Sequence, residues 1–325
     1  MFDLNLSSEF TSNNNNKVNS KTLYDVLVIG GGPAGLNAAL YAKRKGMETA
    51  IIAERVGGQV LDTSSVENYL GTVEVSGQGL MEKFKEHVDH LKIPIKRDAK
   101  VEKVEDGQIK KIHLSGGEII RAKSLIVATG SRPRRLGVPG EDEFSGKGVA
   151  YCAICDGPFF TDLKVAVAGG GNSAVEAAID LSKIASEVVL VHRSDFRADQ
   201  ILIDRLNAIE NVTVLLQTQI LEVKGQSLLT HLHVLDKEAN AERDIDVNGL
   251  FVEIGYLPNS KIFEGLLDMT PSGEIIVNDR TETNVPGIYA AGDVATVPYK
   301  QIIIAASEGA KAALTANDYV NKLNV

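Results

Sequence analysis

The sequence repeats one pattern, a strand followed by a glycine-rich loop and a helix, and this repetition restricts the fold more than any other feature. In the first occurrence, the apolar residues 24–29 (YDVLVI) lead into residues 30–35 (GGGPAG), and a helical pattern follows. Gly30, Gly32 and Gly35 fit the dinucleotide fingerprint, whose glycines permit a tight turn, close approach of a pyrophosphate, and close packing of the helix on the strand. The phosphates would lie at the helix N-terminus. This context predicts a parallel α/β fold with a dinucleotide site.

An acidic residue completes the first pattern. Residues 49–54 (TAIIAE) are the next predicted strand. Glu54 ends this strand about 20 residues after the fingerprint, where a carboxylate can accept a hydrogen bond from a ribose hydroxyl. A carboxylate at this point would repel a 2′-phosphate, so the first pattern suits an unphosphorylated dinucleotide such as FAD.

The pattern recurs at residues 164–174 (KVAVAGGGNSA), again with a predicted helix and strand behind it. Ala174 stands where the third glycine would be, which the fingerprint allows. The following strand ends at residues 192–197 (HRSDFR) instead of an acid. Arg193 and Arg197 could bind a 2′-phosphate through charged hydrogen bonds, which favours NADPH. The alternative interpretation is a solvated basic loop.

Cys152 and Cys155 are the only cysteines of the chain. Two thiolates are too few to close a structural zinc site, and no histidine is near them in the sequence. A structural disulfide across so short a loop would remove little entropy from the unfolded chain. The CxxC spacing therefore favours a dithiol that is oxidised and reduced during function. With the two dinucleotide patterns, it predicts an electron path from NADPH through a flavin to the disulfide.

Length and composition set the remaining limits. A chain of 325 residues exceeds what one hydrophobic core usually serves, so we expect two domains. The net charge of −9 argues against nucleic acid or an anionic membrane as a partner. No apolar run approaches the ~18 residues of a membrane span. Residues 1–21 are rich in Ser and Asn and lack a secretory signal, so we expect a flexible tail or, alternatively, the remnant of a linker.

The small number of cysteines, together with the missing membrane span, predicts a cytoplasmic protein. Two histidine pairs, His87 with His90 and His231 with His233, have spacings that would place each pair on one face of its element. We expect exposed side chains there instead of metal ligands, and we predict no metal site.

The motifs together resemble the low-molecular-weight thioredoxin reductases (class II pyridine nucleotide-disulfide oxidoreductases) and the flavoprotein subunit of alkyl hydroperoxide reductase. The resemblance covers nearly the whole chain from residue 23. It rests on GGGPAG at 30–35, GGQ at 57–59, ENYLG at 67–71, ATG at 128–130, CAICDG at 152–157, GGGNSAVEAA at 169–178 and AAGDV at 290–294.

The resemblance implies an α/β fold with two Rossmann-like domains in three layers. The NADPH-binding domain, residues 137–254, would carry the CxxC pair and be inserted into an FAD-binding domain formed by residues 22–136 and 255–325. Segments near 132–140 and 253–259 would serve as a two-strand hinge between the domains.

The resemblance also implies roles for individual residues. Cys155 would face the flavin, Cys152 would attack the disulfide of a partner protein, and Asp156 would protonate the leaving thiolate. Asp156 could instead be only a turn residue. The residues expected to bind FAD are Gly30, Gly32, Pro33, Ala34, Gly35, Glu54, Gly58, Gln59, Asn68, Thr129, Gly130, Gly292, Asp293, Lys300, Gln301 and Ile302. Those expected to bind the nicotinamide dinucleotide are Gly169, Gly171, Asn172, Ser173, His192, Arg193 and Arg197.

Two departures from the reductase pattern bear on the function. Ser194 stands where those reductases usually carry a second arginine, and the loop is one residue shorter, which weakens the 2′-phosphate clamp and leaves room for NADH. Residues 53–63 (AERVGGQVLDT) and 296–305 (TVPYKQIIIA) look more like the peroxide-reductase flavoprotein, whose N-terminal thioredoxin-like module has no counterpart in this sequence.

We expect a homodimeric thioredoxin-disulfide reductase in which NADPH reduces FAD, FAD reduces the Cys152–Cys155 disulfide, and the dithiol reduces oxidised thioredoxin. The main alternative is an NAD(P)H-dependent reductase of a glutaredoxin-like or thioredoxin-like protein that feeds a peroxiredoxin. A dithiol oxidase of the same fold would need no NADPH site, so Arg193 and Arg197 count against it. A flavin-binding scaffold without enzymatic activity would have no use for the CxxC pair.

Overall fold

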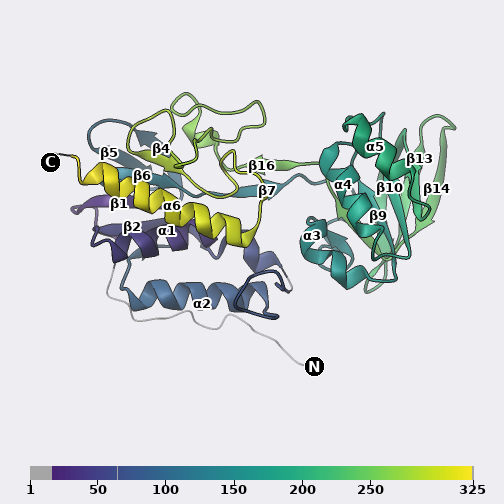
Figure 1. The fold of residues 1–325 in the computed structure, drawn as a ribbon, viewed down its shortest axis with the longest axis horizontal. Coiled ribbons are helices and arrows are strands. Elements are labelled where there is room, and N and C mark those ends of the chain that lie inside the picture. Colours follow the sequence, from purple (N-terminus) through teal and green to yellow (C-terminus); the bar gives the residue numbers. More distant parts are fainter. Residues whose placement is uncertain (1–16, 64, 324–325) are drawn as a thin grey trace. The chain divides into compact units, whose positions relative to one another are not determined.

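Residues 17–63 and 65–323 are described by a computed structural model of the chain (Figure 1), and they divide into two units. Unit 1 comprises Met1–Val60, Gly79–Gly130 and Pro258–Val325, and unit 2 comprises Leu61–Gln78 and Ser131–Leu257. Unit 2 is thus inserted into the sequence of unit 1. The predicted domain boundaries and the cofactor of each domain stay predictions, because the division alone does not show what each unit binds.

Unit 1 is built on a seven-stranded sheet with the order β3-β2-β1-β6-β5-β4, and β17 pairs with β6. The pairs among β1, β2, β3, β6 and β17 are parallel, whereas β4–β5 and β5–β6 are antiparallel. The strands are β1 (Leu23–Gly31), β2 (Thr49–Val56), β3 (Ile95–Lys96), β4 (Val101–Glu105), β5 (Lys110–Leu114), β6 (Ile119–Val127) and β17 (Ile288–Ala290).

The central strand β1 is buried on both faces, as its nearly continuous apolar run predicts. Leu27 and Ile29 join a core cluster with residues of β4, β5 and the segment 263–275, whereas Val26 and Val28 join a cluster with residues of the helices. The sheet therefore lies between two layers, which is the three-layer α/β arrangement that the sequence predicts. The helices are α1 (Pro33–Arg44), α2 (Gly77–His90) and α6 (Ile302–Val320), and the short 3-10 turns are η1 (Gly58–Asp62) and η3 (Lys261–Phe263).

Helices α1 and α6 come from opposite ends of the chain and pack directly on each other (Figure 1). A Cβ at Gly309 of α6 would lie 2.0 Å from the carbonyl oxygen of Ala34 in α1. Only glycine permits this approach. The contact brings the C-terminal helix to the start of α1, directly behind the first glycine-rich loop.

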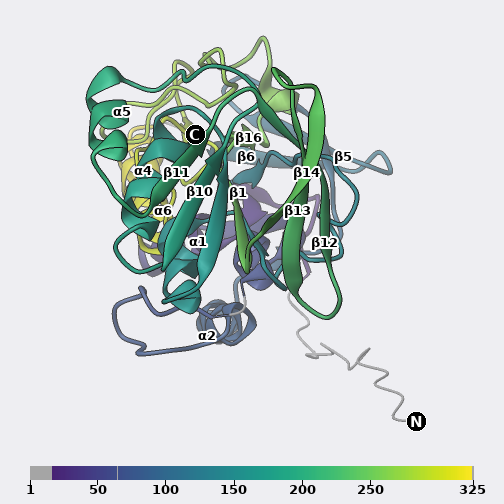
Figure 2. The ribbon, with the colours of Figure 1, turned by 90° about the vertical axis from the view of Figure 1, so that its right-hand side faces the viewer.

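Unit 2 contains a parallel five-stranded sheet with the order β11-β10-β9-β15-β8 and an antiparallel sheet with the order β12-β13-β14. In Figure 2, α4 and α5 lie on one side of β10 and β11, and β12–β14 lie on the other, in agreement with two separate core clusters. The strands are β8 (Val149–Ala150), β9 (Lys164–Ala168), β10 (Glu187–Val191), β11 (Val212–Leu215), β12 (Thr218–Gly225), β13 (Leu229–Asp236), β14 (Ala241–Asp246) and β15 (Gly249–Val252).

The helices of unit 2 are α3 (Ala153–Asp156), α4 (Asn172–Leu181) and α5 (Gln200–Asn207), with a 3-10 turn η2 (Gly157–Phe160). A further two-stranded sheet pairs β7 (Ser131–Pro133) with β16 (Tyr256–Pro258), which lie at the two segments predicted as hinges. Whether these segments act as a hinge stays a prediction.

The predicted N-terminal tail lies mainly at residues 1–16, outside the described residues. The last part of it contacts unit 1, because Val18 packs on a core cluster and the backbone N–H of Asn19 donates to the hydroxyl of Tyr24 at 2.9 Å. In the described part of the chain, no helix is both long enough and apolar enough to cross a membrane.

Candidate active site

Of the three fingerprint glycines of the first loop, two are closely packed and one is open. A Cβ at Gly30 would lie 2.0 Å from the carbonyl oxygen of Ala128, and a Cβ at Gly35 would lie 2.0 Å from that of Gly30. At Gly32 the nearest atom is Cα of Gly58, at 3.9 Å. The first and third glycines therefore permit the packing of strand and helix, and the second leaves free the space that a pyrophosphate would occupy, as the fingerprint requires.

The N-terminus of α1 follows this open position. Gly32 is the N-cap and has no side chain to bind the first helical N–H groups, and Pro33 begins the helix, where it needs no hydrogen-bond acceptor. No acidic residue lies in the first turn. The N–H groups that a first helical turn leaves without an intrahelical acceptor, together with the positive end of the helix dipole, suit a phosphate. The residues of unit 1 thus fit the dinucleotide for which they are predicted.

The C-terminal part of unit 1 returns to this loop. The amide Nε2 of Gln59 lies 3.4 Å from Oδ2 of Asp293, so the predicted GGQ and AAGDV motifs meet. A Cβ at Gly292 would lie 3.0 Å from Cβ of Ala34. This approach places the segment after β17 against the first turn of α1.

The other predicted flavin residues are placed less directly. Glu54 is exposed near the end of β2, and Thr129 donates from Oγ1 to the carbonyl oxygen of Asn259 at 2.8 Å. Lys300 forms an ion pair with Glu274 at 2.8 Å. Gln301 is the N-cap of α6, and Ile302 is the first residue of this helix. Gly130 has a backbone φ of 69°. Asn68 is exposed and belongs to unit 2. Their contacts with FAD stay predictions.

The second glycine-rich loop likewise has one closely packed and one open fingerprint glycine. A Cβ at Gly169 would lie 2.3 Å from the carbonyl oxygen of Glu253 and 2.6 Å from Cβ of Ala174, whereas at Gly171 no atom lies within 4 Å. Ala174 is fully buried, which explains why only a small residue fits there. Gly171 is the N-cap of α4, so this helix also presents free N–H groups beside an open glycine.

Asn172 and Ser173 open helix α4, and both are exposed. The Asn172 amide exchanges two hydrogen bonds with Asp199, one to its carboxylate and one from its backbone N–H, each at 2.8 Å. Asn172 therefore holds the glycine-rich loop to the N-cap of α5. A contact of Asn172 or Ser173 with a nucleotide stays a prediction.

The basic segment after β10 folds back onto the second loop. The backbone N–H of Arg197 donates to the carbonyl oxygen of Gly170 at 2.7 Å, and the ring of His192 packs so closely on Gly170 that a Cβ there would lie 2.2 Å from Cδ2. Burial of His192, together with the charges of Arg197 and Arg193, lowers its pKa. The ring of His192 thus packs against Gly170, and a contact of His192 with a nucleotide stays a prediction. The fingerprint does not require Gly170, and the run of three glycines was the only signal for it.

Arg193 and Arg197 are both exposed. Among the residues that the structure describes, no carboxylate forms an ion pair with either guanidinium. Two unneutralised cations beside an open glycine and a helix N-terminus suit a phosphate of a dinucleotide.

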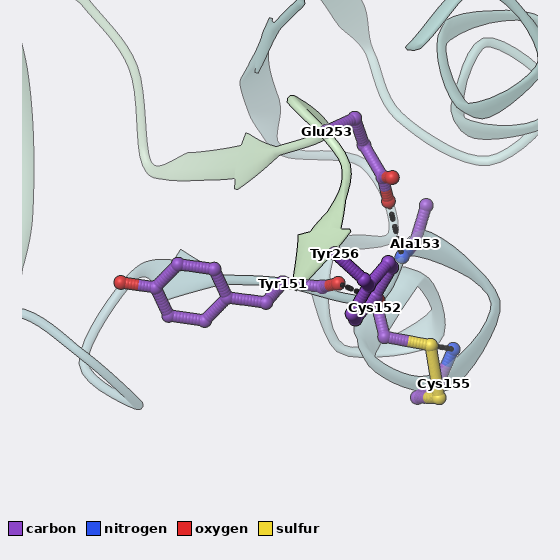
Figure 3. The surroundings of a disulfide bond; sticks show 6 residues. All are labelled: Tyr151, Cys152, Ala153, Cys155, Glu253 and Tyr256. Carbon is purple, nitrogen blue, oxygen red and sulfur yellow. Dashed lines mark hydrogen bonds between the residues drawn. A yellow bond between two sulfur atoms is a disulfide. The ribbon is translucent and has the colours of Figure 1, made fainter. Parts of the chain in front are cut away.

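Cys152 and Cys155 form a disulfide, with their Cα atoms 5.3 Å apart (Figure 3). Cys152 is the N-cap of α3, and its Sγ accepts a hydrogen bond from the backbone N–H of Cys155 at 3.2 Å. Ile154, between the two cysteines, is exposed. The pair is thus joined as a redox dithiol requires and lies on a short turn at the surface of its unit.

Asp156 follows Cys155 directly and ends α3. Burial raises the pKa of its carboxyl to about 6. A carboxyl with this pKa can both hold and release a proton near neutral pH, which is what an acid–base group beside a thiolate needs. The role of Asp156 stays a prediction, but its environment is suited to it.

Sequence reasoning missed Glu253, which follows β15 in the sheet that also carries the glycine-rich loop. Its Oε1 accepts a hydrogen bond from the backbone N–H of Ala153 at 3.3 Å (Figure 3). Burial raises the pKa of Glu253 to about 7, although this hydrogen bond acts in the opposite direction. The available signal was its position, because functional residues of parallel sheets gather at the carboxyl ends of strands.

A second set of missed contacts holds the residues before the disulfide. The hydroxyl of Tyr256 donates to the carbonyl oxygen of Tyr151 at 2.7 Å (Figure 3). The buried carboxylate of Glu141 accepts hydrogen bonds from the hydroxyl of Tyr151 and from the backbone N–H groups of Leu136 and Gly137. Tyr151, which precedes Cys152, is therefore held by hydrogen bonds to Tyr256 of β16 and, through Glu141, to the segment that follows β7.

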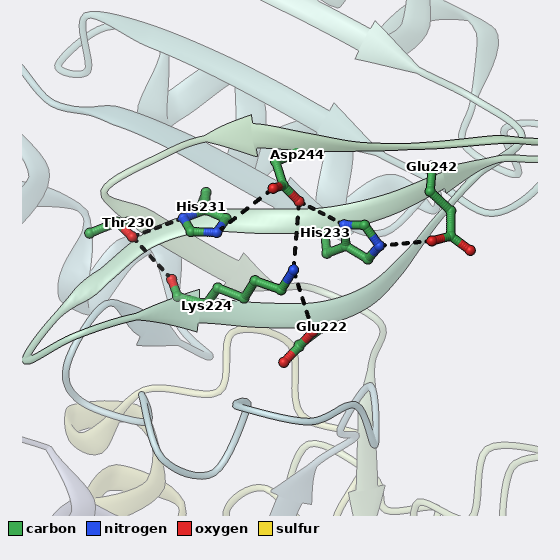
Figure 4. A network of polar contacts seen from close by, with 7 residues as sticks. All are labelled: Glu222, Lys224, Thr230, His231, His233, Glu242 and Asp244. Carbon is green, nitrogen blue, oxygen red and sulfur yellow. Dashed lines mark hydrogen bonds and ion pairs between the residues drawn. The ribbon is translucent and has the colours of Figure 1, made fainter.

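The histidine pair on β13 lies beside carboxylates of β14. His233 lies between two carboxylates, with Nδ1 2.6 Å from Asp244 and Nε2 3.0 Å from Glu242 (Figure 4). Nε2 of His231 lies 3.9 Å from Oδ2 of Asp244. Within residues 17–63 and 65–323, no group of three or more His, Cys, Asp or Glu side chains could hold a metal ion. The network is an electrostatic feature of the β12–β14 sheet.

The fold and the site together define a flavin- and nicotinamide-linked disulfide oxidoreductase. Its features are two glycine-rich loops, each with one open glycine, and a half-buried disulfide next to the desolvated carboxyl of Asp156. The family model described as pyridine nucleotide-disulphide oxidoreductase matches residues 24–309. The chain therefore belongs to this family, which confirms the resemblance seen in the sequence. Proteins of this family use FAD and NAD(P)H, so the prediction of these cofactors is also confirmed; a preference between the two nicotinamides is not.

The individual relatives and solved structures carry three kinds of name. The F subunit of alkyl hydroperoxide reductase in Pseudomonas putida is 46% identical over 94% of this chain and 59% of its own length. A protein named NADH dehydrogenase from Ferdinandcohnia aciditolerans is 44% identical over 92% of this chain and 58% of its own length. The crystal structure of thioredoxin reductase from Streptococcus pyogenes is 36% identical with a TM-score of 0.87, covering 93% of this chain and 99% of that one.

The chain thus spans about three fifths of the curated relatives that it matches, and nearly all of the solved reductase. The prediction of an oxidoreductase of this class is confirmed at the level of the family. The names do not agree on a substrate, so the partner protein is a matter of proposal.

Proposed function

We propose that this chain is an NADPH-dependent, FAD-containing reductase of a small dithiol protein, with oxidised thioredoxin as its substrate. The observation that carries the proposal is the half-buried disulfide Cys152–Cys155, followed directly by the desolvated carboxyl of Asp156. Likeness to thioredoxin reductases over nearly the full length of both chains supports the choice of thioredoxin.

When bound, FAD would accept a hydride from the nicotinamide and pass the electron pair to the disulfide. The residues of unit 1 that would hold it are those around the open position at Gly32, with the N-terminus of α1 at its phosphates and Gln59 and Asp293 beside them. The residues of unit 2 around Gly171, with Arg193 and Arg197, would hold NADPH.

The chemistry of the cysteines follows thiol–disulfide exchange. Two electrons and a proton convert the Cys152–Cys155 disulfide into a thiolate and a thiol. The Cys152 thiolate then attacks one sulfur of the oxidised partner, which forms a mixed disulfide and releases the other partner sulfur as a thiolate. Attack of Cys155 on Sγ of Cys152 reforms the internal disulfide and releases the reduced partner.

Asp156 would supply the proton that the departing thiolate takes up and would recover it from the Cys155 thiol. Its raised pKa, about 6, keeps a fraction of the carboxyl protonated near neutral pH. Cys152, as the N-cap of α3, would be the attacking thiol, because the adjacent N–H of Cys155 can stabilise its thiolate.

A second candidate function is supported by the relatives named as F subunits of alkyl hydroperoxide reductase, which are more similar in sequence than the thioredoxin reductases. In this alternative, NADH or NADPH supplies electrons and the partner is a glutaredoxin-like or thioredoxin-like protein that feeds a peroxiredoxin. The relatives named NADH dehydrogenase add support for NADH.

We further propose a cytoplasmic homodimer. The low cysteine content supports a reducing compartment, in which a two-cysteine redox pair can cycle. The homodimer rests on the family resemblance, and the molar mass in solution measured by light scattering tests it.

Steady-state kinetics with both nicotinamides and several small dithiol proteins test the proposed function. The purified protein should be yellow, and NADPH with thioredoxin should support the highest kcat/KM. Cys152→Ser should abolish reduction of the partner while NADPH still bleaches the flavin. A colourless protein that binds no FAD would overturn the proposal, and turnover with a glutaredoxin-like protein and NADH alone would favour the second candidate.

A further inference from the structure

Lys237 lies in the turn between β13 and β14, far along the chain from the basic segment after β10, yet it contacts that segment directly. Its ammonium Nζ donates a hydrogen bond to the carbonyl oxygen of Arg193 at 2.9 Å. Its backbone N–H donates to the carbonyl oxygen of Gln217 at 2.9 Å. The backbone and the side chain of Lys237 are therefore both held by hydrogen bonds, and its ammonium lies beside Arg193.

The neighbouring residues hold this corner of unit 2 together. The backbone N–H of Thr218 donates to the carbonyl oxygen of His192 at 2.9 Å, and Nε2 of Gln217 donates to the carboxylate of Asp195 at 3.0 Å. Arg197 is attached in turn to Gly170 of the glycine-rich loop. Three separate segments of the chain thus meet beside the second dinucleotide loop.

Three cations meet at this corner, in segments that also hold Asp195, Asp236 and Glu238. Arg193, Arg197 and Lys237 are all exposed, and within the described residues none of them forms an ion pair with a carboxylate. Two of these carboxylates bind neutral groups. Asp195 accepts a hydrogen bond from the amide of Gln217, and Asp236 accepts hydrogen bonds from the backbone N–H groups of Glu238 and Ala239. All three cations lie near enough to His192 to lower its pKa, together with its burial.

The geometry leaves Lys237 able to bind an anion. An ammonium has three N–H donors, and the Arg193 carbonyl accepts one of them. Its side chain is exposed, so the remaining donors are open to solvent and to a ligand. Because this corner lies at the end of β10, where a dinucleotide-binding sheet meets the ribose, the anion that it suits is a phosphate on the ribose 2′-oxygen.

We propose that Lys237 is the third cation of the 2′-phosphate site and a determinant of NADPH over NADH. It supplies from the β13–β14 turn the charge that Ser194 does not supply from the loop, where related reductases usually carry a second arginine. The inference rests on the proposed function, because it assumes that the second loop binds the nicotinamide dinucleotide. It could not be read from the sequence, because Lys237 and Arg193 are 44 residues apart.

Calorimetric binding of 2′,5′-ADP and of 5′-AMP to the FAD-loaded protein tests the proposal without turnover. Lys237→Ala should weaken 2′,5′-ADP binding by about tenfold, the usual effect of losing one hydrogen bond to a charged group, and should change 5′-AMP binding by less than about twofold. Lys237→Arg should restore most of the affinity. The dependence of 2′,5′-ADP affinity on salt should become shallower in Lys237→Ala, because one cation fewer meets the phosphate.

Two control variants separate the possible outcomes. Lys183→Ala removes an exposed lysine at the far end of α4 that pairs with Asp180, and it should leave both affinities unchanged. Arg193→Ala tests the site itself. If Arg193→Ala weakens 2′,5′-ADP binding and Lys237→Ala does not, the role of Lys237 is wrong and the NADPH site stands. If Lys237→Ala weakens both ligands equally, Lys237 only supports the loop and the proposal is overturned. If neither Arg193→Ala nor Lys237→Ala affects 2′,5′-ADP, both the proposal and the NADPH assignment fail.

Discussion

The carboxylate of Glu253 accepts a hydrogen bond from the backbone N–H of Ala153, the residue that follows the redox-active Cys152 (Figure 3). The backbone of Glu253 also packs against Gly169, since a Cβ on that glycine would lie 2.3 Å from the Glu253 carbonyl oxygen. One residue therefore connects the second dinucleotide loop to the turn that carries the disulfide. No step of the proposed reaction uses its carboxyl, yet burial raises the pKa of that carboxyl to about 7.

Glu253→Gln should stabilise the protein at high pH. In the folded chain the pKa of Glu253 is raised from 4.5 to about 7, so between these values the folded state holds a proton that the unfolded state has lost. Stability therefore falls as pH rises through this window and changes no further above it. Glutamine keeps an acceptor for the Ala153 N–H and removes the ionisation. The advantage of the variant should grow by up to about 3 kcal/mol from pH 5 to pH 8.

Urea unfolding of the oxidised protein at the two pH values measures this difference. The raised pKa of Asp156 acts on the wild type and on the variant alike, so it cancels in the comparison. An equal free-energy difference at pH 5 and pH 8 would mean that the Glu253 carboxyl titrates normally.

Asp156→Asn should slow reduction of the partner protein by about 100-fold, because the amide cannot donate a proton to the leaving thiolate. The rate of partner reduction in the wild type should decline as pH rises past about 6, as the carboxyl loses its proton, and this inflection should be missing in the variant. Flavin reduction by NADPH should be unchanged in both. Stopped-flow measurement of the two half-reactions between pH 5 and pH 8 separates them.

Asp162→Asn provides the matched control. Asp162 is an exposed carboxyl with a φ of 61°, a conformation that asparagine also tolerates. This variant should keep the pH dependence of the wild type. If Asp156→Asn retained the full rate and the inflection, Asp156 would be only a turn residue.

Much of the fold and part of the site could be predicted from the sequence. At both predicted places a strand leads through a glycine-rich loop into a helix, because such a loop depends on local backbone geometry that only small residues permit. The helices begin earlier than the apolar pattern suggested, at Pro33 and Asn172, because the fingerprint residues themselves form the first turn. Local patterns of this kind are visible in a single sequence.

Two of the residues that sequence reasoning missed, Glu253 and Lys237, have contacts with residues that are far from them along the chain. Glu253 meets Ala153 across 100 residues, and Lys237 meets Arg193 across 44. Neither belongs to a motif, and each is an ordinary charged residue until the parallel order β9-β15-β8 and the antiparallel β13–β14 turn bring it to the site. Their partners and surroundings depend on burial and topology, which the sequence pattern does not specify for a charged side chain.

Gly171→Ala should leave the fold intact and weaken nicotinamide binding. No atom lies within 4 Å of a Cβ at this position, and the backbone φ of −96° is accessible to alanine. The added methyl group would fill the space in which the pyrophosphate approaches the backbone. We expect an unchanged melting temperature, full FAD content, and a KM for NADPH raised by about tenfold or more, the loss typical of a displaced charged hydrogen bond.

Gly169→Ala is the contrasting variant, because its φ is 151° and its Cβ would overlap the carbonyl oxygen of Glu253. This variant should unfold at lower temperature or fail to fold. If Gly171→Ala bound NADPH as tightly as the wild type, the second loop would not be the pyrophosphate site.

His233→Gln should reduce stability at low pH and have little effect at high pH. Hydrogen bonds from His233 to Asp244 and Glu242 raise its pKa above 6.5 (Figure 4). A raised histidine pKa contributes stability that is fully present below the unfolded value of 6.5 and is lost as pH rises through the folded value. The melting temperature of the variant should therefore fall below that of the wild type at pH 6 and match it at pH 9. His87→Gln, which changes an exposed histidine of α2, is the matched control. An equal loss at both pH values in His233→Gln would show that the ring contributes by packing and not by its charge.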